Sequence, residues 1–431
     1  MTGPPRHSFR VLRDRDFAIF FGAALISNSG SWMQSIAAPY VLYQLTHSTT
    51  WLGIGAFMAF FPALCVGPLA GSLADRFPRK TILFCTQTAM MVTAFSLWAV
   101  WEGGAATPEI IVVLLFFSGI ASGLNIAAWQ SFVPQLVAPA DLLAAVRLNS
   151  MQFVAARAFG PALAGLVLQL YGAGTAFFLN GVSFMLVLGA LLLIHPRVVA
   201  VDAGAGRVMQ HFRDAVAYVR ARAGLFLPVL TIAVLSFFGS SVQQLAPAFA
   251  DEVFGVGKSG YGFLISAFGM GAIVGALIVA FWADQYLRSR VTVIGLLLFA
   301  AGELIFAATH TYAVGIAGMV VMGSAYLLVA TALNTSLQAR VDEAHRGRAI
   351  SIYLMGLLAG VPLGALLEGK LAEVIGLQAT VVSAALALLA CSVAGMVRFE
   401  GFRALDEAIE DETGRGPDLM IDTPPTIAAA D

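Results

Sequence analysis

The sequence predicts an all-α integral membrane protein with twelve transmembrane helices in two pseudo-symmetric six-helix bundles. The first observation is composition: 59% of the 431 residues are hydrophobic and only 11% are charged, whereas soluble domains contain roughly 25% charged residues. The second is a series of apolar runs of the length that a membrane-crossing helix needs, about 20 residues. The third is a single long polar break midway along the chain. Together they exclude a soluble fold, and disorder over most of the chain.

The apolar runs divide the chain into two sets of six, with short loops inside each set. The candidate spans are Phe17–Leu45, Trp51–Ala74, Thr81–Trp101, Pro108–Val133, Ala144–Leu170, Gly174–Ile194, Phe226–Phe249, Gly260–Ala283, Val291–Thr309, Tyr312–Leu337, Ala349–Leu367 and Leu377–Val397. In the central break, Gly206–Ala223 predicts a basic amphipathic helix on the membrane surface. The regions expected are a first bundle (1–194), a cytoplasmic linker (195–224), a second bundle (225–398) and a disordered acidic tail (399–431).

The basic residues predict the orientation. They gather in the N-terminal segment, in the linker and in the loops after even-numbered spans, whereas the loops after odd-numbered spans offer only Lys258 and Lys370. Because cytoplasmic loops are enriched in Lys and Arg, both termini are expected in the cytoplasm. The first run is too long for a signal peptide and is read as an uncleaved helix. Arginine far outnumbers lysine, and alanine and glycine abound, which favours a GC-rich bacterial genome and hence a bacterial inner membrane.

Enzymatic chemistry is not expected from this sequence. The nearest match to a phosphate-binding loop ends in Lys258-Ser259 but has Glu252 where the pattern needs glycine. The histidines and cysteines lack ligand-like spacing, so neither a metal site nor a cofactor is predicted. No nucleophile–base constellation is present, and no nucleic-acid partner is expected.

Polar residues recur at helical spacing in four of the predicted spans, the first of each successive group of three. Such spacing places side chains on one helix face, and we expect these faces to surround one aqueous cavity. The alternative is hydrogen bonding between helices that only stabilises packing. The candidates for a substrate or proton pathway are Ser31, Gln34, Asn125, Gln243, Asn334 and Gln338.

Two ionisable residues lie deep in predicted spans: Arg157 near the middle of the fifth and Glu303 in the ninth. A charge inside the bilayer costs at least roughly 2.5–3.5 kcal/mol on insertion scales, so each implies a partner or a water-filled cavity. Arg157 is a candidate for holding an anionic substrate or for sensing a proton through a carboxylate. A structural ion pair, or a contact with backbone carbonyls, is the alternative.

The two halves are weakly repeated. The run Ala74–Lys80 follows the second span, and the similar run Ala283–Ser289 follows the eighth, six spans later on the same predicted edge. Parallel six-helix repeats are typical of transporters that bind their substrate between the halves.

The loop after the second span, Gly71-Ser-Leu-Ala-Asp75-Arg76-Phe-Pro-Arg79-Lys80, resembles the signature loop between helices 2 and 3 of the major facilitator superfamily. The resemblance implies a latch between the halves in the outward-facing state, with Asp75 engaging the start of helix 11 near Gly347. For Arg79 and Lys80, a purely topological role is the alternative.

A second segment resembles the helix-5 motif of exporters in the superfamily. It contains Gly160, Pro161 and Gly165, with Ala164 where the motif usually has a first glycine. Further runs near Asp16, Gln34 and Asn334 resemble the enterobactin-exporter-like, drug-efflux branch. One departure is the absence of an arginine in the fourth span, where drug:proton antiporters of the superfamily often carry one.

The resemblance implies a secondary active transporter that exports a small organic molecule, drug-like or siderophore-like, by alternating access and in exchange for protons. It is expected to act as a monomer among membrane lipids. An uptake permease for a small organic solute is one alternative. A non-transporting receptor or scaffold built on the same fold is the other.

Overall fold

The computed structural model describes residues 10–197, 208–239, 241–282, 286–342, 345–398 and 400–406. Within them the chain is helical and contains no strand. The helices are α1 (Arg15–Thr46), α2 (Thr49–Arg76), α3 (Arg79–Glu102), α4 (Pro108–Leu136), α5 (Leu142–Leu193), α6 (Val208–Arg220), α7 (Ala223–Gly239), α8 (Ser241–Ala248), α9 (Gly257–Trp282), α10 (Arg288–Ala308), α11 (Tyr312–Arg340), α12 (Arg346–Ile375) and α13 (Leu377–Arg398). Short 3-10 or π segments are η2 (Pro139–Asp141), η3 (Phe249–Val253) and η5 (Glu400–Leu405).

These helices account for the predicted spans and confirm the all-α membrane fold. The long α5 holds the fifth and sixth spans, which part at Gly172, where the backbone turns to φ 85° and ψ 174°. Glycine suits that position because it adopts positive φ without steric cost. The seventh span comprises α7, α8 and the π-helical η3, and α9–α13 supply the last five. Ten segments of the described chain are long and apolar enough to cross a membrane.

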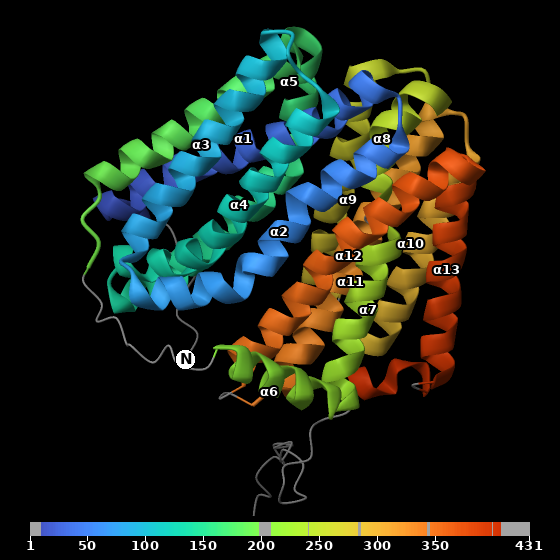
Figure 1. The fold of residues 1–431 in the computed structure, drawn as a ribbon. Coiled ribbons are helices and arrows are strands. Elements are labelled where there is room, and N and C mark those ends of the chain that lie inside the picture. The colour runs from blue at the N-terminus through green and yellow to red at the C-terminus, as the bar shows by residue number, and fades with distance from the viewer. Residues whose placement is uncertain are drawn as a thin grey trace, which may run out of the picture.

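The helices pack in two sets, shown side by side in Figure 1. In the first half (α1–α5), α1 and α3 lie against α5, and α2 lies against α4. In the second half (α7–α13), α11 lies between α9 and α10, while α12 packs on α7 and α13 on α10. The halves meet through two helix pairs, α2 with α12 and α5 with α9. The domain boundaries expected from the sequence stay predictions.

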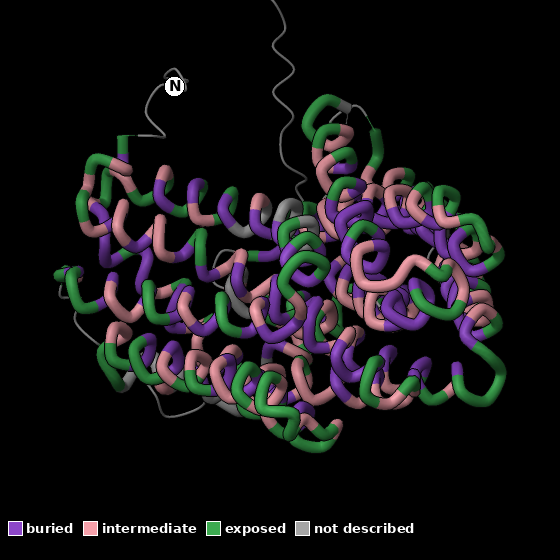
Figure 2. Tube along the Cα trace, turned by 90° about the horizontal axis from the view of Figure 1, so that it is seen from above, coloured by how far each residue is buried: buried purple, intermediate pink, exposed green. Residues whose placement is uncertain are grey.

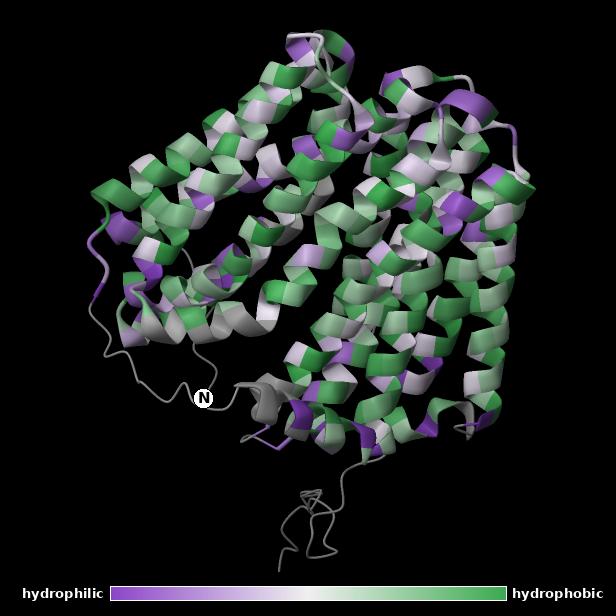
Figure 3. Cartoon of the chain, viewed as in Figure 1, coloured by the Kyte–Doolittle hydropathy of each residue, from purple (hydrophilic) through white to green (hydrophobic). Residues whose placement is uncertain are grey.

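Each half has two ends, which we name by the segments found there. The linker edge carries α6 and the turn between α2 and α3, and the far edge carries the turns between α1 and α2 and between α12 and α13 (Figure 1). Hydrophilic residues gather at both edges, with hydrophobic residues along the helices between them (Figure 3). Buried residues lie within the halves, and many exposed ones lie on their outer faces (Figure 2). This banded surface suits a bilayer.

The start of the predicted disordered tail is ordered. Residues 400–405 form η5, in which Phe402 is 2% exposed and Leu405 is fully buried. The Ser336 hydroxyl donates to the carbonyl of Leu405 at 3.1 Å, and the Ser289 amide donates to Asp406 at 3.1 Å. The prediction of disorder was therefore wrong for residues 400–406, because two apolar side chains fill the linker edge of the second half. Residues 399 and 407–431 lie outside the described part of the chain.

Candidate functional site

Glycines bring the two halves into backbone contact on both shared helix pairs. Between α2 and α12, a Cβ on Gly53 would lie 2.4 Å from the carbonyl oxygen of Ala365, and one on Gly369 would lie 2.5 Å from that of Thr49. Between α5 and α9, a Cβ on Gly165 would lie 2.6 Å from the Cα of Gly262. No side chain fits at these separations, so the glycines are what allow the halves to approach so closely.

Polar contacts join the halves at the far edge. The Tyr43 hydroxyl of α1 donates to the Glu252 carboxylate of η3. On α12, the Glu373 carboxylate accepts from the hydroxyl of Ser48 and, at 3.2 Å, from the amide of Thr50. One turn earlier, the Thr49 hydroxyl donates to the carbonyl of Gly369 at 2.8 Å. We call this group of contacts the far-edge seal.

The described polar contacts at the linker edge do not join one helical half to the other. Lys80 donates to the carbonyl of Ile194 at 2.8 Å, and both residues belong to the first half. Tyr218 of α6 donates to Asp342, beyond the end of α11, at 2.8 Å. In Figure 1 the helices of the two halves converge toward the far edge and diverge toward the linker edge. Among the described residues, the polar contacts that fasten the halves to each other therefore lie at the far edge.

Two of the predicted pathway residues in the first half bond to neighbouring helices of that half. The buried Gln34 of α1 accepts from Asn180 Nδ2 of α5 at 2.8 Å. Asn125 of α4 accepts from Thr86 Oγ1 at 3.0 Å and from Gln87 Nε2 at 3.1 Å, both on α3. This is the interhelical hydrogen bonding that the sequence left open as the alternative to cavity lining.

The other pathway candidates are partly open. Ser31 on α1 and Gln243 on α8 are half-buried. Near the linker edge of α11, Gln338 donates to Asn334, and Gln338 is exposed. Within the described residues, no hydrogen bond brings the polar candidates of the first half together with those of the second.

The latch and helix-5 candidates lie where the sequence predicted turns and close packing. Gly71, Asp75 and Arg76 lie in the last turns of α2, but their side chains are outside the described part of the structure. Arg79 is half-buried and begins α3. The partner expected for Asp75, near Gly347, is likewise outside what is described.

In the helix-5 motif, Gly160 is buried, and a Cβ there would lie 2.7 Å from the Cβ of Trp32 on α1. Gly165, also buried, lies against α9 in the other half as described above. The side chains of Arg157 and Pro161 are outside the described part. The motif therefore lies where α5 meets both α1 and the second half.

A buried pair of carboxyl groups lies inside the second half. Glu303 on α10 is 0% exposed, Glu368 on α12 is 3% exposed, and the two interact electrostatically. Sequence reasoning found Glu303 but missed Glu368, because the predicted eleventh span ended one residue before it. The helix in fact continues to Ile375. The partners in the far-edge seal were also missed, since nothing in the local pattern at Ser48, Glu252 or Glu373 indicates a distant contact.

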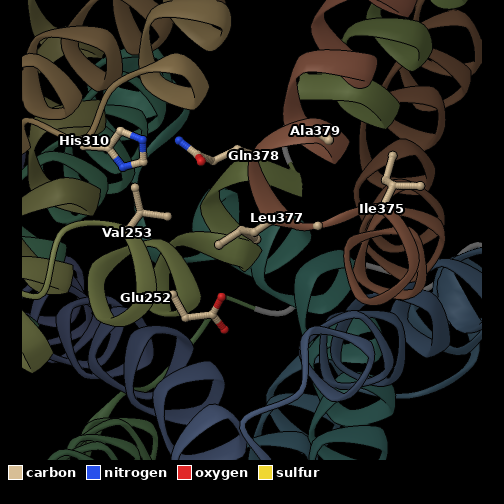
Figure 4. Close-up of a pocket in the computed structure, with 8 residues that line it drawn as sticks. Glu252, Val253, His310, Ile375, Leu377, Gln378 and Ala379 are labelled. Atoms are coloured by element: carbon tan, nitrogen blue, oxygen red, sulfur yellow. The ribbon is translucent and has the colours of Figure 1, made fainter.

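A cavity of about 440 Å³ opens at the far edge of the second half. Figure 4 shows Gln378 pointing toward His310, with Glu252 on the side nearer the first half. Its lining residues are Glu252, Val253, His310, Ile375, Gly376, Leu377, Gln378 and Ala379. It lies apart from the polar candidates predicted from the sequence.

Two helical halves joined face to face, with an apolar band around them and buried polar groups within, define a multi-pass membrane transporter. The sequence model of the family described as "Transmembrane secretion effector" matches residues 7–418. The chain belongs to this family, which is part of the major facilitator superfamily and its efflux branch. It is a transporter and not an enzyme.

Relatives cover most of the chain. It is 23% identical over 362 residues to the Staphyloferrin A transporter of Staphylococcus aureus (strain NCTC 8325 / PS 47), which covers 84% of this chain and 90% of that protein. It is 24% identical over 416 residues to the multidrug efflux pump Tap of Mycobacterium tuberculosis (strain ATCC 25618 / H37Rv), covering 93% and 96%. Among solved structures, a bacterial homologue of the human lysosomal transporter Spinster, inward-facing and occupied, superposes with a TM-score of 0.70 at 16% identity. That match covers 94% of this chain and all (100%) of the other, and it shows the shared fold.

Proposed function

We propose that this protein is a secondary active exporter that moves a small organic molecule across the membrane by alternating access, in exchange for protons. One observation carries the proposal: the halves are fastened by the far-edge seal and diverge at the linker edge. Rocking of two halves about a shared site is how transporters of this architecture expose that site to each side in turn. A receptor or scaffold would have no need of a seal made at one edge.

The linker edge faces the cytoplasm in this proposal. It carries the basic residues of the α2–α3 turn and of α6, and positive loops remain on the cytoplasmic side. The seal then closes the outer side, and the protein lies in a bacterial inner membrane with both termini in the cytoplasm. The protein works as a monomer surrounded by lipid.

The substrate is proposed to be a drug-like or siderophore-like molecule. The names of the two relatives, a siderophore transporter and a multidrug efflux pump, support this class. It would bind between the halves, near the half-buried Ser31 and Gln243, and would meet Asn334 and Gln338 on the linker-edge side. Arg157 is the proposed contact for an anionic group.

Transport by reconstituted vesicles tests the proposal. Ethidium and a catecholate chelator are the probes, and export predicts their accumulation in vesicles whose linker edge faces outward, driven by an inside-acidic pH gradient. Nigericin, which collapses the gradient, should abolish accumulation. Accumulation in vesicles of the opposite orientation would establish an uptake permease. No transport of any probe, with or without a pH gradient, would favour a receptor or scaffold.

The variant Arg157→Ala tests the proposed contact with an anionic group of the substrate. We expect it to abolish export of an anionic probe while membrane insertion remains normal. Arg147→Ala is its control, because Arg147 is exposed on the same helix. Unchanged transport by Arg157→Ala would remove Arg157 from the mechanism.

A further inference from the structure

We propose that Glu303 and Glu368 together form a proton-binding site inside the second half, and that its protonation controls the far-edge seal. The inference deepens the proposed proton exchange and rests on it for its role in transport. The proton site itself can be tested without any transported molecule.

The two carboxyl groups come from different helices, and both are buried inside the second half. Glu303 lies near the far end of α10 and Glu368 near the far end of α12, at 0% and 3% exposure. Contacts one turn earlier place both beside the seventh span. Phe299 of α10 lies against Gly239, and Gly364 of α12 lies against the backbone of Phe237. The pair therefore sits where α10 and α12 flank the same helix.

Among the described residues, no hydrogen-bond donor stabilises a negative charge on Glu303. Neither of its carboxyl oxygens has a hydrogen-bond partner. An ionised carboxylate without water or donors is strongly disfavoured, and a neighbouring carboxyl disfavours it further. Two carboxyl groups that repel each other when both are ionised keep a proton on one of them. A proton is therefore the ligand that fits this pair.

In the described part of the chain, the group that acts electrostatically on Glu303 is acidic and not basic. α7 carries no titratable side chain, and Glu368 is the group that acts electrostatically on Glu303. The other titratable or charged groups on elements packed against α10 are Tyr312, Tyr326 and Arg340 on α11, Cys391 and Arg398 on α13, and Glu400, Arg403 and Asp406 at η5. The titratable or charged groups on α12 and on α2, which packs against it, include Tyr353, Lys370 and Glu373 on α12 and Asp75 and Arg76 at the opposite end of α2.

The far-edge cavity offers an entry route. Its lining residue Gln378 donates to the carbonyl of Ala307 at 2.8 Å. Ala307 lies one helical turn beyond Glu303, about 6 Å along the helix axis. Two further lining residues, Glu252 and His310, are themselves titratable (Figure 4). The buried pair is thus one turn from a cavity at the outer side.

The same pair adjoins the seal. Glu368 directly precedes Gly369, whose carbonyl accepts from Thr49 and whose backbone lies against that of α2. When the proton leaves, two negative charges face each other and push α10 and α12 apart. Because α12 carries half of the seal, this movement loosens it. The pair with one proton therefore favours the closed far edge, and the fully ionised pair favours the open one.

The transport cycle binds one proton at the pair and releases it on the other side. In the far-open state one carboxylate takes a proton from the outer side, an O–H bond forms, and the seal closes. Loss of that proton toward the linker-edge compartment breaks the O–H bond and restores the carboxylate. The direction agrees with inward proton flow coupled to outward movement of a solute.

Infrared spectroscopy of the full-length protein in nanodiscs tests proton binding. Protonated carboxyl groups have a C=O stretching band of their own, which Glu303→Gln and Glu368→Gln should each reduce. Glu109→Gln, at an exposed far-edge carboxyl, is the matched control and should leave the buried-carboxyl band unchanged. Equal bands in the wild type and in both pair variants would overturn the proton site.

Distance measurements between spin labels test control of the seal. Ala105→Cys and Thr311→Cys place one label on each half at exposed far-edge positions, in a background with Cys65, Cys85 and Cys391 replaced by serine. Raising the pH should lengthen the wild-type distance, whereas Glu303→Gln/Glu368→Gln should keep the short distance at every pH. Glu109→Gln should respond like the wild type. Wild-type pH dependence in the double variant would overturn the proposal.

These readouts separate the inference from the proposed function. A protein that fails to move any probe but shows both results retains the proton site, and only the exporter proposal falls. A protein that exports probes in exchange for protons but lacks both results retains its function, and its proton binds elsewhere. Size-exclusion chromatography of each variant verifies folding.

Discussion

The hydroxyl of Thr49 donates a 2.8 Å hydrogen bond to the backbone carbonyl of Gly369, joining residues 320 positions apart. The bond links the first turn of α2 to the last turns of α12, beside the point where Gly53 meets Ala365. A side-chain donor and a bare backbone thus form the centre of the far-edge seal. The predictions that follow concern this seal, the second glycine contact, and two segments at the linker edge, α6 and η5.

Gly369→Ala should open the seal. Its Cβ would lie 2.5 Å from the carbonyl oxygen of Thr49, and this backbone cannot move aside without separating the helices. Overpacking of this kind costs about 1–3 kcal/mol, which shifts the closed-to-open ratio at least about fivefold. The Ala105/Thr311 label pair measures the shift. Gly67→Ala on α2 is the control, because nothing lies within 4 Å of its Cβ position; equal effects of the two variants would contradict the explanation.

Tyr43→Phe should weaken the same closure from the α1 side. The variant removes the hydroxyl that donates to Glu252, and hydrogen bonds to charged groups contribute about 1.5–3 kcal/mol. A double-mutant cycle with Glu252→Gln, using the label pair, measures the coupling. We expect a coupling of at least about 1 kcal/mol. Tyr171→Phe, at an exposed far-edge tyrosine, should have no effect. Strict additivity in the cycle would show that the contact contributes nothing.

Gly165→Ala and Gly262→Ala should each destabilise the folded protein. Their backbones touch across the interface, so a methyl group on either forces α5 and α9 apart. The expected loss is about 1–3 kcal/mol each, seen as a lower thermal midpoint in detergent. Gly189→Ala, also on α5 but in open space, should leave the midpoint unchanged or raise it. A neutral Gly165→Ala would show that the interface relaxes around a methyl group.

Tyr218 should hold α6 against the α11–α12 turn in a pH-dependent way. Burial, followed by the hydrogen bond to Asp342, raises the pKa of Tyr218 above its ordinary value. A raised pKa means that the contact stabilises fully below the pKa of a free tyrosine, about 10, and is lost as pH rises through the folded value. The difference in tyrosinate absorbance between the wild type and Tyr218→Phe reports ionisation of Tyr218. It should therefore develop above pH ~10.

At pH 8 the same variant should expose the end of α6. Trypsin cleavage at Arg220 and Arg222 is expected to become severalfold faster, since the variant loses the hydrogen bond to Asp342 and keeps only the ring, which lies 4.1 Å from the Arg222 guanidinium. Tyr286→Phe, at an exposed tyrosine of the same edge, is the control. Cleavage at the wild-type rate in Tyr218→Phe would mean that other contacts hold α6.

The segment after α13 should contribute to stability. Phe402 is 2% exposed, and removing a buried phenylalanine side chain costs about 3–5 kcal/mol, so Phe402→Ala should lower the thermal midpoint by several degrees. Asp406→Ala should cost about 1 kcal/mol, because Asp406 accepts from an amide in the first turn of α10. Phe77→Ala, at an exposed side chain of the linker edge, serves as the control. Wild-type stability of Phe402→Ala would show that η5 only rests on the surface.

Local patterns were enough to predict the helices. Apolar runs of membrane length predicted the spans, and the break between the fifth and sixth spans was expected beside Gly172, where glycine takes positive φ. Gly165 was singled out by its motif, and the structure shows the neighbour that requires it, Gly262. Helical spacing also placed Gln34 and Asn125 on polar faces. It did not show that Asn180 and Thr86 would be their partners.

The sequence by itself determined the membrane class, the helices and their order, because the cost of exposing backbone polar groups to lipid acts on each segment separately. Only the tertiary structure decided which residues meet. The electrostatic interaction of Glu303 with Glu368 depends on how helices pack within the second half. The bonds from Ser48 to Glu373 and from Thr49 to Gly369 depend on how the two halves lean together. Residues hundreds of positions apart become neighbours through packing, and no local period encodes that choice.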